Sequence, residues 1–140
     1  MPRKQYFDQL FSPFSGWHRD QHDGICYFDL DMVGVCPACA KPLFLADTIY
    51  NKDFRFRGKS AWQQRPYVFL AQAADIPFYE FFYTVDESTQ FRDVIRFDIR
   101  RIYPHSDKQW SNLTPDQMLQ FLEHMALKSH GPDCESKEYL

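Results

Sequence analysis

The chain has 140 residues, of which 44% are hydrophobic and 25% charged, so its length and composition fit one soluble domain with a single core. Its formal net charge of −3 argues against non-specific nucleic-acid binding by the molecule as a whole, although basic residues gather at Arg55–Lys59 and Arg92–Arg101. No apolar run approaches the roughly 18 residues of a membrane span, and none resembles a signal peptide. We therefore expect a cytoplasmic protein without membrane contact, whose four cysteines are reduced thiols.

The first half of the chain predicts a short helix followed by a β-hairpin. Residues 4–14 place apolar side chains at helical spacing and end at a Ser-Pro-Phe-Ser-Gly loop. Two runs rich in aromatic and branched residues, 26–35 and 42–50, flank a turn and predict the two strands of the hairpin. A further strand near 17–22 is the alternative to a loop there.

The second half predicts a helix, two strands and a final helix. A helix is expected near 59–74, with Pro66 at a kink or in the first turn. Strand-like runs at 77–85 and 94–103 follow. The clearest helix spans 115–129, because Thr114-Pro-Asp-Gln117 is a capping box and apolar residues then repeat at helical spacing.

This order of elements predicts one domain over residues 1–140, which ends in an acidic tail at 131–140. The fold class is α/β, in its α+β form: a mixed central sheet with a β-hairpin or meander, flanked by helices.

The hairpin places carboxylates side by side on one face. In the expected register Val35 pairs with Leu43, and Asp31 pairs with Asp47. Like charges directly opposite each other destabilise a sheet unless a cation lies between them. Three carboxylates have this parity, at one end of an otherwise apolar face: Asp29, Asp31 and Asp47. Such oxygen ligands suit Mg²⁺ or Mn²⁺. The alternatives are solvated strand-end aspartates, or a register shifted by one residue.

The turn itself contains Cys36-Pro-Ala-Cys39, a spacing typical of zinc knuckles. A structural zinc ion needs four ligands, and Cys26 would lie about 30 Å away along an extended strand. Cys134 can reach the turn only through a tertiary contact that the sequence does not reveal. Two turn cysteines without metal, and an exposed Cys134 in the tail, are therefore the simpler interpretation.

A polar segment at the start of the 59–74 helix contains Gln63 and Tyr67, four residues apart and close to basic Lys59 and Arg65. Such groups can contact a phosphate or an attacking water. The alternative is a polar helix start with Tyr67 packed into the core.

The two hairpin strands, Asp29-Leu-Asp-Met-Val33 and Pro42-Leu-Phe-Leu-Ala-Asp47, and the helix and strand after them resemble the PD-(D/E)XK nuclease-like superfamily. The resemblance covers roughly residues 6–83 and extends to small phage and bacterial proteins of this type. It implies a restriction-endonuclease-like core: a helix, a three-stranded meander, a helix and a further strand. It also implies metal ligation by the two carboxylates that match the family motif, Asp31 and Asp47.

One position departs from that motif. The lysine expected two residues after Asp47 is Ile49, and this lysine orients the attacking water in the family. Lys52 or Lys59 is a candidate replacement. Gln63 and Tyr67 resemble the Q-x-x-x-Y motif of recombination exonucleases in the superfamily.

The resemblance predicts a Mg²⁺- or Mn²⁺-dependent DNA phosphodiester hydrolase. Asp31, Asp47, Lys52, Lys59 and Gln63 are its candidate catalytic residues, with Asp29 assisting the metal. The alternative is a catalytically inactive nuclease-like fold of phage or mobile-element type that binds protein or nucleic acid. A third interpretation is a small adaptor stabilised by zinc at the two turn cysteines.

Overall fold

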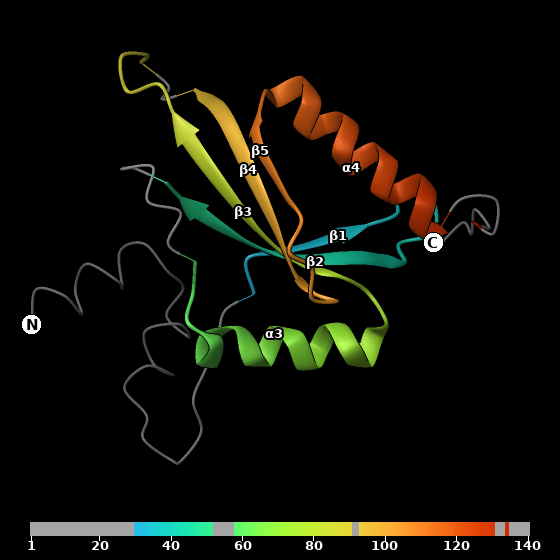
Figure 1. The fold of residues 1–140 in the computed structure, drawn as a ribbon. Coiled ribbons are helices and arrows are strands. Elements are labelled where there is room, and N and C mark those ends of the chain that lie inside the picture. The colour runs from blue at the N-terminus through green and yellow to red at the C-terminus, as the bar shows by residue number, and fades with distance from the viewer. Residues whose placement is uncertain (1–29, 52–57, 91–92, 131–133, 135–140) are drawn as a thin grey trace, which may run out of the picture.

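The computed structural model describes residues 30–51, 58–90, 93–130 and 134. The strands are β1 (Met32–Val35), β2 (Pro42–Tyr50), β3 (Phe78–Val85), β4 (Val94–Tyr103) and β5 (Gln109–Leu113), and the helices are α3 (Ala61–Ala74) and α4 (Pro115–His130). The sheet lies between the two helices, with α3 on one face and α4 on the other (Figure 1). The predicted α+β class with a mixed central sheet is confirmed.

The five strands lie side by side in chain order. Strands β2 and β3 are parallel and are connected through α3, whereas the other three neighbouring pairs are antiparallel. Two predictions, the helix at 4–14 and the strand near 17–22, lie outside the described residues. The restriction-endonuclease-like core therefore stays a prediction.

The β1–β2 hairpin has the predicted register over most of its length. Met32 pairs with Ala46, and Val33 with Leu45. The predicted pairing of Val35 with Leu43 is wrong, because a bulge after Gly34 sets Val35 opposite Pro42. The bulge inserts one residue beside the turn and leaves the register at the other end of the hairpin unchanged.

Helix α3 begins at a capping box that the sequence analysis did not identify. The Ser60 hydroxyl accepts a hydrogen bond from the Gln63 N–H at 3.3 Å, and the Gln63 side chain accepts one from the Ser60 N–H at 3.0 Å. Pro66 lies inside the helix beyond its first turn, so of its two predicted positions, a kink or the first turn, the second is wrong. The helix ends at Asp75, whose φ of 55° is left-handed.

The capping box predicted for α4 is confirmed. The Thr114 N–H donates to the Gln117 side chain at 2.9 Å, and the Gln117 N–H donates to the Thr114 hydroxyl at 3.2 Å. The helix buries Met118 and Met125 against the sheet and extends to His130, one residue beyond its predicted end.

Strand β5 was not predicted. Its sequence, Gln-Trp-Ser-Asn-Leu, has no residue that is fully buried, because it pairs only with β4 at the edge of the sheet. Hydrogen bonding to β4, rather than an apolar face of its own, holds this strand in place. Within the described segments, neither helix is long and apolar enough to cross a membrane.

The two faces of the sheet have different cores. The α4 face is defined by alternate residues that pack against α4: Phe44, Ala46, Tyr79, Phe81 and Ile99. The α3 face carries the opposite parity, and its apolar cluster is Leu45, Phe78, Tyr67, Ala71 and Ile76. Asp47 and Glu80 follow Leu45 and Phe78 by two residues, so they also point to the α3 face.

Candidate functional site

Asp31 and Asp47 are brought together at the end of the hairpin. Continuing the observed register by one pair beyond Met32 and Ala46 sets Asp31 opposite Asp47, as predicted. Oδ2 of Asp31 accepts a hydrogen bond from the Thr48 N–H at 3.1 Å, which holds the exposed carboxylate against β2. Asp47 itself is fully buried. Asp29, the third predicted metal ligand, lies outside the described residues.

Lys59 supplies a positive charge at Asp47. Its Nζ lies 3.2 Å from Oδ1 of Asp47, and its side chain is one-third exposed. The contact is an ion pair rather than a well-directed hydrogen bond. Lys59 precedes α3, and its Nζ lies 5.4 Å from the centre of the Tyr67 ring on that helix. Of the two candidate lysines, the structure brings Lys59 to the carboxylate, and Lys52 lies outside the described residues.

Glu80 is a buried carboxylate that the sequence analysis missed. It pairs with Asp47 across the parallel β2–β3 ladder and is 0% exposed. Its Oε2 accepts a hydrogen bond from the Lys59 backbone N–H at 2.8 Å, and Oε1 lies 3.8 Å from the Arg100 guanidinium. Glu80 therefore fixes the backbone that carries Lys59. In the sequence, Glu80 could have been noticed as a single carboxylate in the middle of an aromatic strand.

The pKa values at this site reflect burial of charge. Burial raises the pKa of Asp47, the nearby charges of Asp31 and Glu80 add to this effect, and Lys59 only partly offsets it. For Lys59, burial acts to lower the pKa, but the contact and charge of Asp47 outweigh it and raise the pKa. The lysine is thus held as a cation beside a carboxylate whose charge is incompletely balanced.

Asp47 has a second oxygen that is available to a cation. Oδ2 is buried and has no hydrogen-bond donor among the described residues. An ionised oxygen buried without a partner is costly, and a divalent cation bound there would remove that cost. Mg²⁺ commonly uses only one or two protein carboxylates and completes its coordination with water and phosphate oxygens. In the described segments the acidic residues do not bring three ligand atoms within 4.8 Å of one another.

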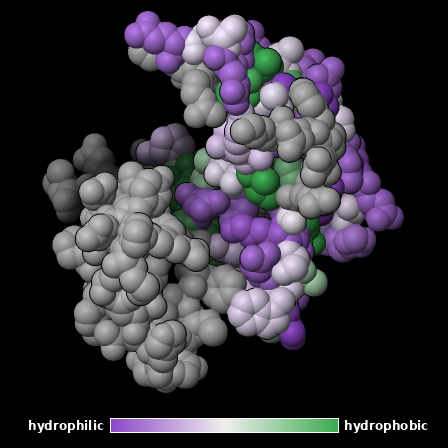
Figure 2. Space-filling model, turned by 90° about the vertical axis from the view of Figure 1, so that its left-hand side faces the viewer, coloured by the Kyte–Doolittle hydropathy of each residue, from purple (hydrophilic) through white to green (hydrophobic). Residues whose placement is uncertain are grey.

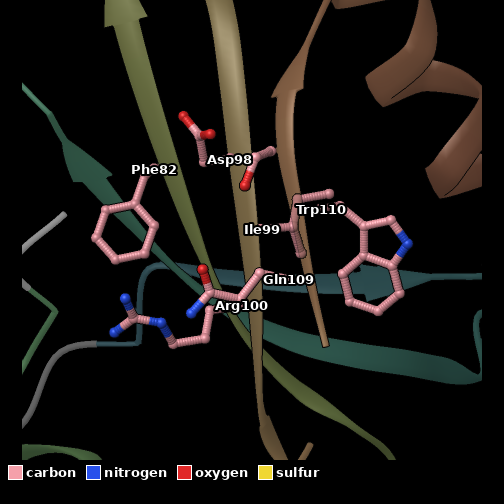
Figure 3. A pocket seen from close by; sticks show the side chains of 7 residues that line it. Phe82, Asp98, Ile99, Arg100, Gln109 and Trp110 are labelled. Atoms are coloured by element: carbon pink, nitrogen blue, oxygen red, sulfur yellow. The ribbon is translucent and has the colours of Figure 1, made fainter. Parts of the chain in front are cut away.

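The neighbouring buried carboxylate, Asp98 on β4, has a different environment. Its two oxygens contact the Arg96 guanidinium at 3.2 Å, and Oδ1 also accepts the Asn112 N–H at 2.9 Å. Figure 3 shows Asp98 in the hollow between β3, β4 and β5, where the Arg100 guanidinium lies beside the Phe82 ring. Because protein groups balance its charge, Asp98 has a structural role in joining β4 to β5.

Gln63 and Tyr67 do not form the predicted phosphate-binding pair. The Gln63 side chain is used in the capping box with Ser60. Tyr67 is 3% exposed and stacks on Phe78, with ring centres 5.2 Å apart. The prediction of Gln63 as a catalytic residue is thus not supported by its contacts, whereas packing of Tyr67 in the core was the stated alternative.

The turn cysteines have a third neighbour. Cys36, Cys39 and Cys134 place their sulfur atoms within 4.8 Å of one another, and this group can hold a metal ion. Sγ of Cys36 lies 3.5 Å from Sγ of Cys134. Cys134 is half-buried against the α4-face core, so the expectation of an exposed tail thiol is wrong. Cys26 lies outside the described residues.

Figure 2 views the molecule from the side at which β2 and β3 end and α3 begins, where the coloured atoms include both hydrophilic and hydrophobic residues. No protein-family model matches the chain, and comparisons with curated proteins and with solved structures find no match. The geometry of the described residues therefore carries the functional argument.

Proposed function

We propose that the chain is a Mg²⁺- or Mn²⁺-dependent phosphodiester hydrolase acting on DNA, with Asp31 and Asp47 as metal ligands. The observation that carries this proposal is the buried Asp47 carboxylate, with Lys59 on one oxygen and no donor among the described residues on the other. Asp98 differs because the Arg96 guanidinium lies 3.2 Å from both of its oxygens, although its Oδ2 also lacks a directed hydrogen bond. A divalent cation held by this carboxylate pair would supply the partner that Oδ2 of Asp47 lacks among the described residues.

Lys59 takes the place of the lysine that the family motif puts at Ile49. Its Nζ lies 3.2 Å from Oδ1 of Asp47, one of the two carboxylates that would hold the cation. The cation would supply Lewis-acid polarisation of a phosphoryl oxygen and a bound water of lowered pKa. Lys59 stabilises the negative charge that develops during attack on phosphorus, and Glu80 positions Lys59 through its backbone N–H.

A cleavage assay tests this proposal. Plasmid and single-stranded DNA are incubated with the purified chain and Mg²⁺ or Mn²⁺, alongside Asp31→Asn, Asp47→Asn and Asp107→Asn. The first two variants should lose cleavage while remaining folded. Asp107 is a fully exposed carboxylate, so its variant is the matched control and should cleave normally. Cleavage that persists in Asp31→Asn would rule out the assignment.

A second candidate function is binding without catalysis by the same fold. Ile49 at the motif lysine position favours a protein-binding or nucleic-acid-binding module, and α3 exposes large apolar side chains that suit a protein partner: Trp62, Phe69 and Leu70. This function predicts no cleavage with either metal. DNA titrations at two salt concentrations then distinguish a nucleic-acid partner from a protein partner, because affinity that depends on phosphate contacts falls as salt rises.

A further inference from the structure

The β1–β2 turn is built to present two sulfur atoms to the same side. Cys36 follows β1, and its N–H donates to the Lys41 carbonyl at 2.9 Å, while its carbonyl accepts from the Ala40 N–H at 2.7 Å. Ala40 has a left-handed φ of 62°, which closes the turn tightly. The sulfur atoms of Cys36 and Cys39 lie within 4.8 Å of each other.

The third sulfur comes from the segment after α4. Cys134 lies 98 positions from Cys36 along the chain, yet their sulfur atoms are 3.5 Å apart. Figure 1 shows the end of α4 beside the turn that joins β1 to β2. Four thiols in a chain of this size have no general reason to converge, so a cluster of three at one point needs a physical cause.

The spacing of the three sulfurs fits a tetrahedral metal. Zinc–thiolate bonds of about 2.3 Å at tetrahedral angles put sulfur atoms about 3.8 Å apart. The observed cluster has one pair at 3.5 Å and all three sulfurs within 4.8 Å. Changes of up to about 1 Å in these separations would bring all three sulfurs to that spacing. The soft thiolates select zinc over Mg²⁺, whose preferred ligands are oxygens.

From this arrangement we propose that Cys36, Cys39 and Cys134 bind one zinc ion, which joins the β1–β2 turn to the chain beyond α4. Three protein thiolates leave the fourth position for water or another ligand. Zinc binding releases the thiol protons as the Zn–S bonds form, and no redox change occurs. The site does not depend on the proposed nuclease function, because its ligands are separate from the Asp47 carboxylate.

Cobalt substitution tests the site directly. The full-length chain is reduced, freed of metal and titrated with Co²⁺ without oxygen, and Zn²⁺ is then added. We expect a thiolate-to-cobalt charge-transfer band that saturates at one equivalent of Co²⁺ and that Zn²⁺ removes. In Cys134→Ser the affinity should fall at least tenfold and the band by about a third, because two of three thiolates remain.

Two further measurements keep the result decisive. Asp107→Asn, which changes an exposed carboxylate, is the control and should titrate like the wild-type chain. The charge-transfer band reports thiolate ligands alone, which separates this site from the proposed carboxylate site. Circular dichroism should show that Cys134→Ser stays folded, because Cys134 lies after the last helix. The absence of a charge-transfer band in the wild-type chain, or an unchanged titration of Cys134→Ser, would overturn the proposal.

Limited proteolysis gives an independent readout. Zn²⁺ should slow cleavage of the chain beyond α4 in the wild-type protein and have no such effect in Cys134→Ser. Equal cleavage of the wild-type chain with and without Zn²⁺ would contradict the inferred connection.

Discussion

The two faces of the sheet use the same strands for different purposes. On the α4 face, aromatic side chains from β2 and β3 contact one another: Phe44 lies 5.8 Å from Phe81 and 6.3 Å from Tyr79 between ring centres. On the α3 face, the same two strands carry Asp47 and Glu80, both 0% exposed. Charges buried at that depth reduce stability unless they are paired, so the apolar α4 face stabilises the fold, and the charged residues of the α3 face are those for which we propose a function.

This comparison predicts that substitutions on the two faces affect different properties of the protein. Those on the α4 face should reduce stability and leave metal binding by the folded molecules unchanged. Those at Asp47, Lys59 and Gly58 should affect metal binding or cleavage more than stability.

The largest expected effect is on the α4 face. Phe81 is 3% exposed and packs between Phe44 and Tyr79. Phe81→Ala should lower the free energy of unfolding by about 3–5 kcal/mol, because it removes buried apolar surface and leaves a cavity. Urea unfolding followed by circular dichroism measures the loss. A change below 1 kcal/mol, on the scale of surface substitutions, would show that this aromatic cluster is not the main core.

On the α3 face, Lys59→Met should reduce the proposed cleavage rate by about 100- to 1,000-fold, which corresponds to roughly 2.7–4 kcal/mol of transition-state stabilisation. The methionine keeps much of the side-chain volume and removes the charge beside Asp47. Single-turnover cleavage at saturating Mg²⁺ is the measurement. Lys52→Met is the matched comparison, and a larger loss there would reassign the catalytic lysine.

Two glycines provide a matched pair of small substitutions. A Cβ at Gly34 would overlap the Phe44 ring on the α4 face, whereas a Cβ at Gly58 would lie 2.5 Å from a Glu80 carboxylate oxygen. Gly34→Ala should therefore cost about 1–3 kcal/mol of stability with no loss of Mg²⁺ affinity per folded molecule. Gly58→Ala should displace Glu80 and the backbone of Lys59, which lowers the cleavage rate more than the stability.

Thermal unfolding and cleavage assays on both glycine variants test this contrast. The division between the faces fails if Gly34→Ala changes the cleavage rate of folded protein, or if Gly58→Ala changes stability alone.

The smallest expected effect is an increase in stability. Burial raises the pKa of Asp47 above its usual value of 3.8, so the native state holds this proton more tightly than the unfolded chain does. Ionised Asp47 therefore costs stability at pH 7, and the cost disappears as the pH falls below 3.8. Asp47→Asn should raise the free energy of unfolding at pH 7 by about 0.5–2 kcal/mol in metal-free buffer.

Urea unfolding at several pH values, with wild type and Asp47→Asn side by side, gives this difference. The difference in the free energy of unfolding between the two proteins should become smaller as the pH falls. A variant that is less stable than wild type at pH 7 would mean that the Lys59 ion pair outweighs the burial of the carboxylate.

Local patterns in the sequence predicted much of this fold. Alternating apolar residues predicted β4 at 94–103, the observed bounds, and the capping box at Thr114 predicted the start of α4. A turn centred on Cys39 predicted a register that holds beyond the bulge, which is why Asp31 and Asp47 were paired correctly. These features depend on residues close in sequence, where periodicity and capping chemistry act.

The features that the sequence did not reveal depend on long-range contacts. Glu80 reaches Asp47 only because β2 and β3 are parallel neighbours, and Lys59 approaches both through the connection before α3. Cys134 reaches the turn because α4 crosses the sheet and ends beside it. Strand β5 is an edge strand without an apolar pattern of its own. None of these leaves a local signal that identifies its partner.

The most direct test of the proposed metal site is a calorimetric titration of Mg²⁺ and Mn²⁺ into the wild-type chain, Asp31→Asn and Asp47→Asn, with Asp107→Asn as the control. Our account predicts saturable binding by the wild-type chain and the control, and its loss in both hairpin variants while they stay folded. Binding that is unchanged in Asp47→Asn, or absent from the wild-type chain, would contradict the account of the α3 face as a metal site.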